Sequence, residues 1–392
     1  MSSPLTSSQP LRILMAACVP RRREGGVATM IYHFTDELVK RGHSVTCIFW
    51  EDLFGQDRIA PRFAELIFAR RLSRYIAGRR GSFSVVNLHA PSGIWYGMHR
   101  RWLGSPNDPP YVMTLHGLEE RRIYAQSREA KKGRAWNFAL HNRLWHRFYR
   151  MPLFRWSIRT ADGAHTVGRD TWNVLLLKYN LNFERTAYIP NGVDARFFHP
   201  RRYDSAGPLK LLYAGTWLDQ RGIFYIRDAL KRLAPQLPGL TMTFAGCGVP
   251  AEVIREFFGP QLASTVVVQP VVPSEEIHEL YAGHDVFLFP SLMEGLPSVL
   301  LEAMASGMPV VTTETCGMQD VVETEYNGIL IPPANSGAIE SAVLRLAAAP
   351  ELRERLGQAA QQTMKRYTWE RSALMLEDLF RRVIAGEGKT RE

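Results

Sequence analysis

The sequence predicts an α/β protein built from two doubly wound parallel sheets. Two similar units, each a short apolar strand, a glycine-containing loop, a helix and a second strand, begin near residues 11 and 209. Such a unit is the usual start of a doubly wound sheet. Runs such as Val286–Phe289 are continuously apolar, as expected of parallel strands buried on both faces. A chain of 392 residues is also long enough for two domains.

The composition is that of an ordinary globular protein, with 46% hydrophobic and 22% charged residues. Residues 1–10 are polar and lack the apolar core of a signal peptide. We find no run of about 18 apolar residues, so no transmembrane helix is expected. Four cysteines show no metal-like spacing, which favours reduced thiols in a cytoplasmic protein: Cys18, Cys47, Cys247 and Cys316.

Charge is divided unevenly between the two halves of the chain. Residues 1–195 carry 29 Lys and Arg against 15 Asp and Glu, whereas residues 196–392 carry 19 against 23. A basic first half suggests an anionic partner, either nucleic acid or an anionic membrane surface. The chain has no nucleic-acid-binding motif, so we expect no nucleic acid partner and favour the membrane.

The first strand unit combines a strand within residues 11–19, a loop with Gly25 and Gly26, and a helix over Ala28–Val39. A second strand follows over Ser44–Trp50. The glycines would let the backbone come close to a ligand at the carboxyl end of the first strand. A plain tight turn is an equally good interpretation of two glycines.

Two further strands, Val85–Ala90 and Tyr111–Leu115, bring histidines to strand ends. Open α/β sheets bind ligands at the carboxyl ends of their strands, which makes His116 a candidate site residue. His89 is a weaker candidate at a similar position. The alternative for both is that they are structural, as most single histidines are.

Residues 119–160 combine 11 Lys and Arg with three acidic residues and many aromatic side chains. Helical spacing of Trp145, Phe148 and Tyr149 suits a segment at a membrane interface, with aromatic rings among headgroups and arginines on phosphates. The competing interpretation is that the aromatic rings pack into the first domain and the arginines form its solvated face.

The second half opens with a strand over Leu209–Ala214, after a linker-like stretch at residues 201–208. Gly215 follows the strand, and a helix begins after Gly222. Arg221 lies in the intervening loop, where a cation after a strand end suits phosphate binding better than a surface charge.

Two carboxylates, eight residues apart, flank a predicted helix that begins at Pro297 and ends at Gly307. Glu294 precedes the helix, and Glu302, in its second turn, can lean back toward the N-terminus. The helix N-terminus favours an anion such as phosphate, while carboxylates accept hydrogen bonds from hydroxyls. A sugar nucleotide fits this site. The plain alternative is a turn residue and a solvated helix residue.

The stretch from Pro290 to Val311 resembles the signature of the retaining, nucleotide-sugar-dependent glycosyltransferases of family 4, which have the GT-B fold. Further stretches similar to this family lie along the chain, at Asn191–Asp194, Asp320–Val322, Asn327–Leu330 and Arg366–Glu370. The resemblance implies two Rossmann-like domains facing a deep cleft. It implies a first domain at 1–190, a linker at 191–208, a second domain at 209–366 and a helix at 367–392 that crosses back.

The resemblance also implies roles for individual residues. Glu302 would bind the ribose of a UDP- or GDP-sugar donor, and Glu294 and His116 would act on the transferred sugar. Other expected donor-binding residues are Gly25, Gly26, Gly215, Thr216, Arg221, Gly295 and Leu296. The family usually has arginine where this chain has Thr216, which leaves one phosphate contact in doubt, and lysine where it has Arg221. No metal or other cofactor is expected.

We therefore expect transfer of a sugar to an acceptor hydroxyl with retention, the acceptor being a lipid-linked or other glycan precursor. The protein would stay cytoplasmic, or on the inner face of the membrane through residues 119–160. The open alternatives are a sugar-nucleotide epimerase or phosphorylase on the same fold, a soluble small-molecule acceptor, and an inactive binding subunit.

Overall fold

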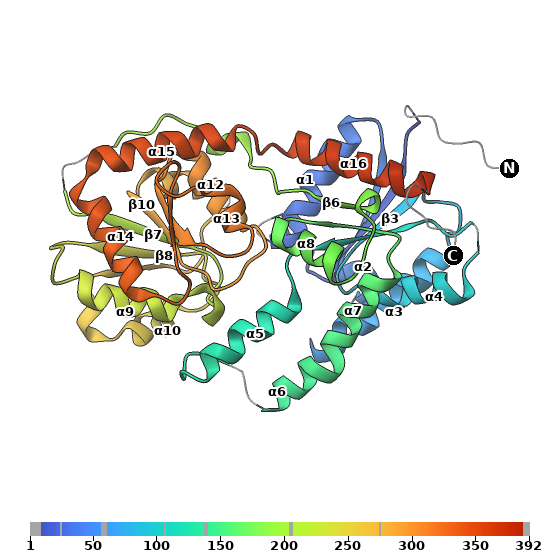
Figure 1. The fold of residues 1–392 in the computed structure, drawn as a ribbon, viewed down its shortest axis with the longest axis horizontal. Helices are drawn as coiled ribbons and strands as arrows, with labels where there is room; N and C mark the ends of the chain where they lie inside the picture. Colours follow the sequence, from blue (N-terminus) through green and yellow to red (C-terminus); the bar gives the residue numbers. More distant parts are fainter. Residues whose placement is uncertain are drawn as a thin grey trace. The chain divides into compact units, whose positions relative to one another are not determined.

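Two parallel six-stranded sheets organise the chain (Figure 1). The computed structural model describes residues 9–23, 26–55, 61–105, 107–136, 140–203, 207–273 and 276–386. The fold class predicted from the sequence, α/β with two doubly wound parallel sheets, is confirmed. Contacts group the residues into two units. The first contains Met1–Glu119, Ala139–Asn191 and Trp369–Glu392, and the second contains Glu120–Phe138 and Gly192–Thr368.

The first sheet has the strand order β2-β1-β3-β4-β5-β6, and all its pairs are parallel. The order changes direction between β1 and β3, which is where doubly wound sheets bind ligands. Its strands are β1 Arg12–Ala16, β2 Ser44–Ile48, β3 Val85–His89, β4 Tyr111–Leu115, β5 Gly163–Thr166 and β6 Thr186–Tyr188.

Helices of the first unit cover this sheet. The described ones are α1 Gly26–Lys40, α2 Trp50–Phe54, α3 Pro61–Ala77, α4 Ile94–Leu103, α6 Leu140–Trp145, α7 Met151–Thr160, α8 Arg169–Leu177 and α16 Trp369–Ala385. A π-helical turn, η1 His146–Arg150, joins α6 to α7, and a short 3-10 turn, η2 Phe183–Arg185, precedes β6. The last helix, α16, belongs to this unit through an ion pair of Glu377 with Arg41 and stacking of Trp369 on His33.

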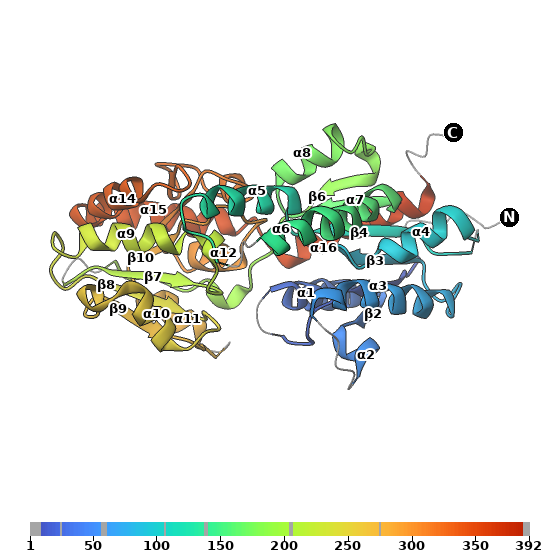
Figure 2. The same ribbon diagram turned by 90° about the horizontal axis from the view of Figure 1, so that it is seen from below.

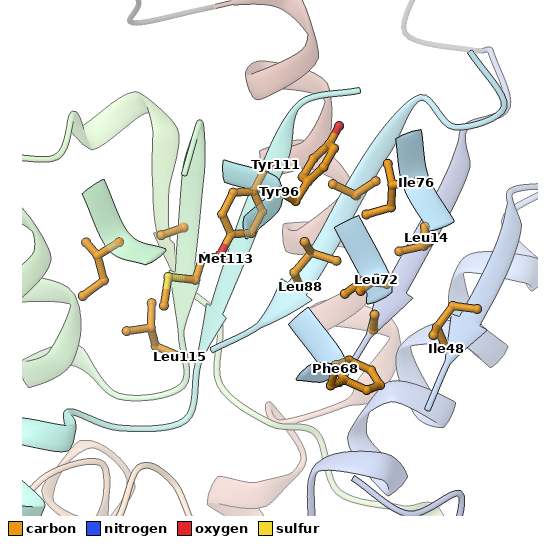
Figure 3. Packing of buried hydrophobic residues seen from close by; sticks show 14 of the residues in the cluster. Leu14, Ile48, Phe68, Leu72, Ile76, Leu88, Tyr96, Tyr111, Met113 and Leu115 are labelled. Atoms are coloured by element: carbon orange, nitrogen blue, oxygen red, sulfur yellow. The ribbon is translucent and has the colours of Figure 1, made fainter. Parts of the chain in front are cut away.

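The core of the first unit lies between its sheet and the helices (Figure 3). Phe68, Leu72 and Ile76 recur at helical spacing on α3 and pack with strand residues Leu14 and Leu88. All five side chains are fully buried. This apolar packing fixes the strand ends from which the candidate site residues of this unit project.

The second sheet has the order β12-β11-β10-β7-β8-β9, again entirely parallel. Its direction changes between β7 and β10. The strands are β7 Lys210–Ala214, β8 Thr241–Ala245, β9 Val266–Gln269, β10 Val286–Phe289, β11 Val310–Thr313 and β12 Ile329–Ile331. Figure 2 shows helices on both sides of β7.

Helix α9 packs against α14, and α12 packs against α15. The described helices of this unit are α5 Glu119–Ala130 (in this unit from Glu120 onward), α9 Ile223–Leu233, α10 Ala251–Phe258, α11 Ile277–Ala282, α12 Ser298–Ala305, α13 Met318–Val321, α14 Ser336–Ala348 and α15 Pro350–Met364. Short 3-10 turns are η3 Ala195–Phe197, η4 Asp219–Arg221 and η5 Pro260–Leu262.

Several elements are shorter than the sequence predicts. The first strand ends at Ala16 rather than Val19. The apolar run Val266–Val272 also predicts a strand, but β9 ends at Gln269, because Pro270 has no N–H for the sheet. Helix α12 starts at Ser298, with Pro297 at the preceding N-cap position. The sequence also predicts a short helix over Ser274–Tyr281; helix α11 starts at Ile277, and Ser274 lies outside the described residues.

Candidate functional site

The second unit places two predicted site residues together at the point where its strand order changes direction. Arg221 ends η4, which follows β7, and Glu294 lies in the loop after β10. The Nε atom of Arg221 is 2.9 Å from Oε1 of Glu294, and both side chains are largely buried. The carboxyl edges of neighbouring strands β7 and β10 thus supply one cation and one carboxylate to a single site.

The backbone holds these two loops against each other. Leu292 N–H donates to the carbonyl of Gln220 over 2.8 Å, and the Ser291 hydroxyl also donates to it over 3.2 Å. Gly222 has a φ of +77°, and a Cβ there would lie 2.1 Å from the Pro290 carbonyl oxygen. A side chain at this glycine would push the loops apart, which explains why glycine ends the turn that carries Arg221.

Gly215 makes room for the Arg221 side chain. Its φ is +134°, and a Cβ at this position would lie 2.2 Å from Nη1 of Arg221. The guanidinium also lies over the Phe289 ring, 5.5 Å from its centroid. The next residue, Thr216, is exposed, and its carbonyl accepts a hydrogen bond from the Tyr213 hydroxyl over 3.0 Å.

Burial dominates the electrostatics of the pair. It raises the pKa of Glu294 above its usual value, although the Arg221 cation opposes the rise. Burial acts to lower the pKa of Arg221, but Glu294 and the Tyr213 hydroxyl together outweigh it and raise that pKa, so the guanidinium stays charged. The site therefore keeps a permanent cation, and an anionic ligand could replace Glu294 as its ion-pair partner.

Glu302 has a different partner. Its Oε2 accepts a hydrogen bond of 2.8 Å from the hydroxyl of Tyr281, a fully buried residue of α11. Burial raises the pKa of Glu302, and the bond from Tyr281 partly offsets this rise. The structure thus holds the predicted ribose carboxylate in one orientation. Tyr281 could not be singled out from the sequence, because nothing in its local motif differs from a core tyrosine.

Gly295 and Leu296, both predicted to bind the donor, are buried. The Gly295 carbonyl accepts a hydrogen bond of 2.7 Å from Gly317 N–H, and a Cβ on Gly317 would lie 2.0 Å from that carbonyl oxygen. This carbonyl therefore faces the protein. Contact of Gly295 and Leu296 with a donor stays a prediction, as does the role of Thr216.

In the first unit, the two histidines predicted at strand ends lie next to each other. The Nδ1 atom of His89, the last residue of β3, is 2.8 Å from Nε2 of His116, which follows β4. A third histidine, His165 on β5, shares a 2.7 Å hydrogen bond with Thr114 of β4. His165 was not predicted, because its strand is only four residues long and carries no apolar run.

Burial keeps these histidines neutral. It lowers the pKa of His116 to about 4 and that of His165 to about 3. It also places the pKa of His89 well below its usual value, with a further contribution from His116. At neutral pH, His116 can therefore offer a neutral ring to a ligand, with His89 fixing which nitrogen carries the proton.

The glycine loop after β1 is only partly described. Gly26 begins α1 with a φ of +72°, and nothing lies within 4 Å of a Cβ built on it. Gly25 lies outside the described residues. The positive φ agrees with a backbone that needs glycine at Gly26, while donor contact by this loop stays a prediction.

The basic aromatic segment 119–160 divides between the two units. Residues 120–136 pack in the second unit, where Trp136 contacts the aromatic rings of Trp217, Phe224 and Phe257. In the first unit, Arg150 is held by Glu119 and Glu65, whereas Phe148 is 70% exposed. Within the described part of the chain, no helix is long and apolar enough to cross a bilayer.

No group of three or more His, Cys, Asp and Glu side chains among the described residues is arranged to hold a metal ion.

Comparison with known proteins gives consistent matches along the chain. Residues 24–197 match the model for Glycosyltransferase Family 4, and residues 196–363 match the model for Glycosyl transferases group 1. The chain is 25% identical over 325 residues to an MMP alpha-(1->4)-mannosyltransferase from Mycolicibacterium hassiacum, covering 81% of this chain and 75% of that protein. It is 28% identical over 183 residues to the amylovoran biosynthesis glycosyltransferase AmsK of Erwinia amylovora, 45% of each chain. Several curated relatives match over less than half of their own length.

Solved structures share the fold. Sucrose-phosphate synthase from Thermosynechococcus elongatus superimposes with a TM-score of 0.76 at 18% identity, covering 95% of this chain and 98% of that one. Anabaena HepE in complex with UDP-glucose superimposes with a TM-score of 0.66 at 15% identity, covering 93% and 98%. With both halves matched by family models and both sheets matched in solved structures, the chain belongs to the group 1, family 4 glycosyltransferases, which have the GT-B fold.

Proposed function

We propose that the protein transfers a sugar from a nucleotide-sugar donor, a UDP- or GDP-sugar, to an acceptor hydroxyl with retention of configuration. The observation that carries the proposal is the buried Arg221–Glu294 pair at the strand-order switch of the second sheet. A cation and a carboxylate at this place suit the charged and the hydroxyl-bearing parts of one ligand.

In this proposal, each carboxylate of the second unit takes one part of the donor. Glu302, oriented by Tyr281, accepts hydrogen bonds from ribose hydroxyls. Arg221 binds the diphosphate, aided by the N-terminus of α12, and Glu294 is released to bind hydroxyls of the transferred sugar. His116 would act on the sugar as a neutral hydrogen-bonding ring.

The transfer would break the bond between the sugar C1 and the phosphate oxygen and form one between C1 and the acceptor oxygen. The acceptor proton would pass to the departing phosphate oxygen. Negative charge grows on the diphosphate as the bond breaks, and a buried, preoriented guanidinium stabilises such charge more than it stabilises the ground state. We propose that Arg221 takes this role and that the reaction uses no metal ion or other cofactor.

We further propose a glycan precursor as acceptor, presented at an anionic membrane on the cytoplasmic side. The names of relatives that make amylovoran or transfer mannose support a glycan acceptor. Membrane binding is supported by a patch on α4 and α7 of the first unit. A hollow of 350 Å³ in this patch is lined by Arg101, Trp102, Trp156 and Arg159. Trp102 and Trp156 are 55% and 40% exposed, as interfacial aromatic residues are.

A donor screen tests the proposal. The full-length protein is mixed with UDP-glucose, UDP-N-acetylglucosamine or GDP-mannose, and its thermal unfolding is followed, because a ligand of the folded state raises the midpoint. The stabilising donor is then incubated with lipid extract or with glycan fragments, and the sugar is traced. Sugar incorporated with the donor's anomeric configuration supports the proposal. An epimerised nucleotide formed from donor alone, or no stabilisation by any nucleotide sugar, would overturn it.

A further inference from the structure

A segment of the first half of the chain is built into the second unit. We call residues 120–136 the arm: it comprises α5 from Glu120 onward and the turn that follows. The arm begins four residues after His116, yet its described contacts are with η4, α9, α10 and Trp217 of the second unit. Figure 1 marks α5.

The end of the arm is fixed by aromatic packing. The Trp136 ring is stacked on Trp217, with centroids 5.8 Å apart and planes 28° apart. The ring centroids of Phe224 in α9 and Phe257 in α10 lie 5.5 and 5.9 Å from that of Trp136. Trp217 is itself buried and lies two residues after Gly215, in the loop that leads from β7 to η4. This packing therefore reaches the loop of the candidate phosphate site.

A polar contact joins the same point directly to η4. Trp136 N–H donates to Oδ2 of Asp219 over 2.8 Å, and Gln220 N–H donates to its Oδ1 over 2.7 Å. Asp219 is only 7% exposed. Burial raises its pKa, and these backbone N–H groups work against that rise by stabilising the carboxylate. Asp219 is the first residue of the turn that Arg221 ends, so the arm is bonded to the turn itself.

The remainder of the arm is fastened to α9, the helix that starts right after the turn. Arg134 forms an ion pair of 2.7 Å with Asp228. The Tyr225 hydroxyl donates to Glu129 over 2.6 Å and accepts from Lys132 over 3.0 Å. These contacts hold the arm on α9 without involving η4. They therefore serve as a control for the hydrogen bond between Trp136 and Asp219, which does involve η4.

We propose that the arm is a positioning element for the donor diphosphate, and that Trp136 and Asp219 hold the turn from which Arg221 binds it. The inference rests on the proposed function of Arg221. The turn has two supports: the loop after β10, through Leu292 and Gln220, and the arm, through Trp136 and Asp219. Because the turn is held from both sides, the Arg221 guanidinium is oriented before the ligand binds. Binding then loses less conformational entropy than it would with a mobile side chain.

The test compares nucleoside diphosphate with monophosphate in the full-length protein. Calorimetry gives the affinities for UDP and UMP and for GDP and GMP, and the diphosphate-to-monophosphate ratio of the pair that binds reports the second phosphate contact. Asp219→Asn removes the charged acceptor of Trp136 N–H, whereas Trp136→Ala keeps that backbone N–H but removes the ring packing that places it. Each variant should lower this ratio about tenfold, as the loss of one charged hydrogen bond from Arg221 to the second phosphate would, and leave the monophosphate affinity unchanged. Tyr225→Phe, which loosens the arm only at α9, should leave the ratio unchanged.

A second background separates the inference from the function on which it rests. In an Arg221→Ala protein the ratio should already be low, and adding Asp219→Asn should lower it no further, because the arm acts through Arg221. If Arg221→Ala leaves the ratio unchanged, the phosphate role of Arg221 is wrong. If Arg221→Ala lowers it but Asp219→Asn and the folded Trp136→Ala protein do not, the arm has no positioning role. Circular dichroism and urea unfolding confirm that each variant is folded.

Discussion

Arg221 and Glu294 form a buried ion pair whose Nε and Oε1 atoms lie 2.9 Å apart, at neighbouring strand ends of the second sheet. In this arrangement the Arg221 guanidinium, to which we assign diphosphate binding, is already paired with the Glu294 carboxylate of the same site. Donor binding would therefore exchange one anion for another around Arg221. The pair can be separated experimentally, because each partner has a different predicted role.

Glu294→Gln should raise affinity for free UDP or GDP about fivefold while lowering sugar transfer strongly. The substitution leaves Arg221 buried without its counterion, and a buried unpaired charge favours an incoming anion by on the order of 1 kcal/mol. Calorimetry with the nucleoside diphosphate and steady-state transfer assays measure the two effects. Weaker nucleoside diphosphate binding would mean that Glu294 supports the diphosphate site rather than competing for it.

Arg221→Ala should lower kcat more than it weakens donor binding, because charge grows on the diphosphate during bond breaking. Arg221→Lys should recover most of the activity, since it retains the cation, although it loses the fork geometry of the guanidinium. If the two variants behave alike in transfer assays, the charge at residue 221 is not what matters.

Glu302→Ala should weaken donor binding by about tenfold or more, because charged hydrogen bonds contribute about 1.5–3 kcal/mol each. Tyr281→Phe should have a smaller effect in the same direction, since it removes only the hydroxyl that orients Glu302. Both effects should shrink with a 2′-deoxyribonucleotide donor if Glu302 binds that hydroxyl. Equal losses with ribose and deoxyribose donors would argue against the ribose contact.

Gly215→Ala should impair donor binding and reduce the free energy of unfolding by about 1–3 kcal/mol, the usual cost of a strained backbone position. Its Cβ would meet Nη1 of Arg221 and displace the guanidinium. Gly246→Ala is a matched control after the neighbouring strand β8, with a φ of +63° but open space around a Cβ. Gly246→Ala should cost stability without affecting donor binding; equal effects on donor binding would remove the specific role of Gly215.

The stability of the first unit should fall on acidification. Burial lowers the pKa of His116 to about 4, whereas a histidine in the unfolded chain titrates near about 6.5. Between these values the unfolded chain binds more protons, so the free energy of unfolding falls as the pH is lowered through the window. The slope is up to about 1.4 kcal/mol per pH unit for each such histidine.

Urea unfolding between about pH 7 and about pH 5 checks this, with His116→Asn expected to reduce the slope. His141→Asn, which removes an exposed histidine of α6, is the matched control. Burial raises the pKa values of Glu294 and Glu302, so these carboxyl groups increase the free energy of unfolding as the pH is lowered. Both variants retain them, so they do not affect the comparison. An unchanged slope in His116→Asn would show that His116 is not buried as a neutral ring.

The patch on α4 and α7 should bind anionic vesicles at low salt, because each basic residue near such a surface contributes about 1 kcal/mol. Arg101→Glu with Arg159→Glu should abolish co-sedimentation with vesicles of phosphatidylglycerol and phosphatidylcholine. Arg255→Glu with Lys365→Glu changes the charge equally on exposed positions of the second unit and serves as control. Protein that stays in the supernatant at low salt, or equal loss in both pairs, would contradict a membrane role for this patch.

The sequence allowed the fold class and many of the strands to be predicted, because many buried parallel strands are apolar runs and several of them are followed directly by glycine or proline. It also singled out Arg221 and Glu294 separately, each from its own loop. Their contact depends on β7 lying beside β10, which local pattern does not specify. His89 became a stronger candidate only through its distance to His116. Tyr281 and Asp219 were missed, because a buried tyrosine and a turn aspartate are common and their partners lie far along the chain.

The grouping of Glu120–Phe138 with the second unit has a consequence for modularity. The chain changes unit not once but four times, after Glu119, Phe138, Asn191 and Thr368. A cut near residue 190 therefore yields no self-contained half: one piece keeps the arm without its partners, and the other keeps η4 without Trp136. Exchanging halves between members of the family would separate the turn that carries Arg221 from one of its two supports, the arm, unless residues 120–136 were exchanged together with the second half.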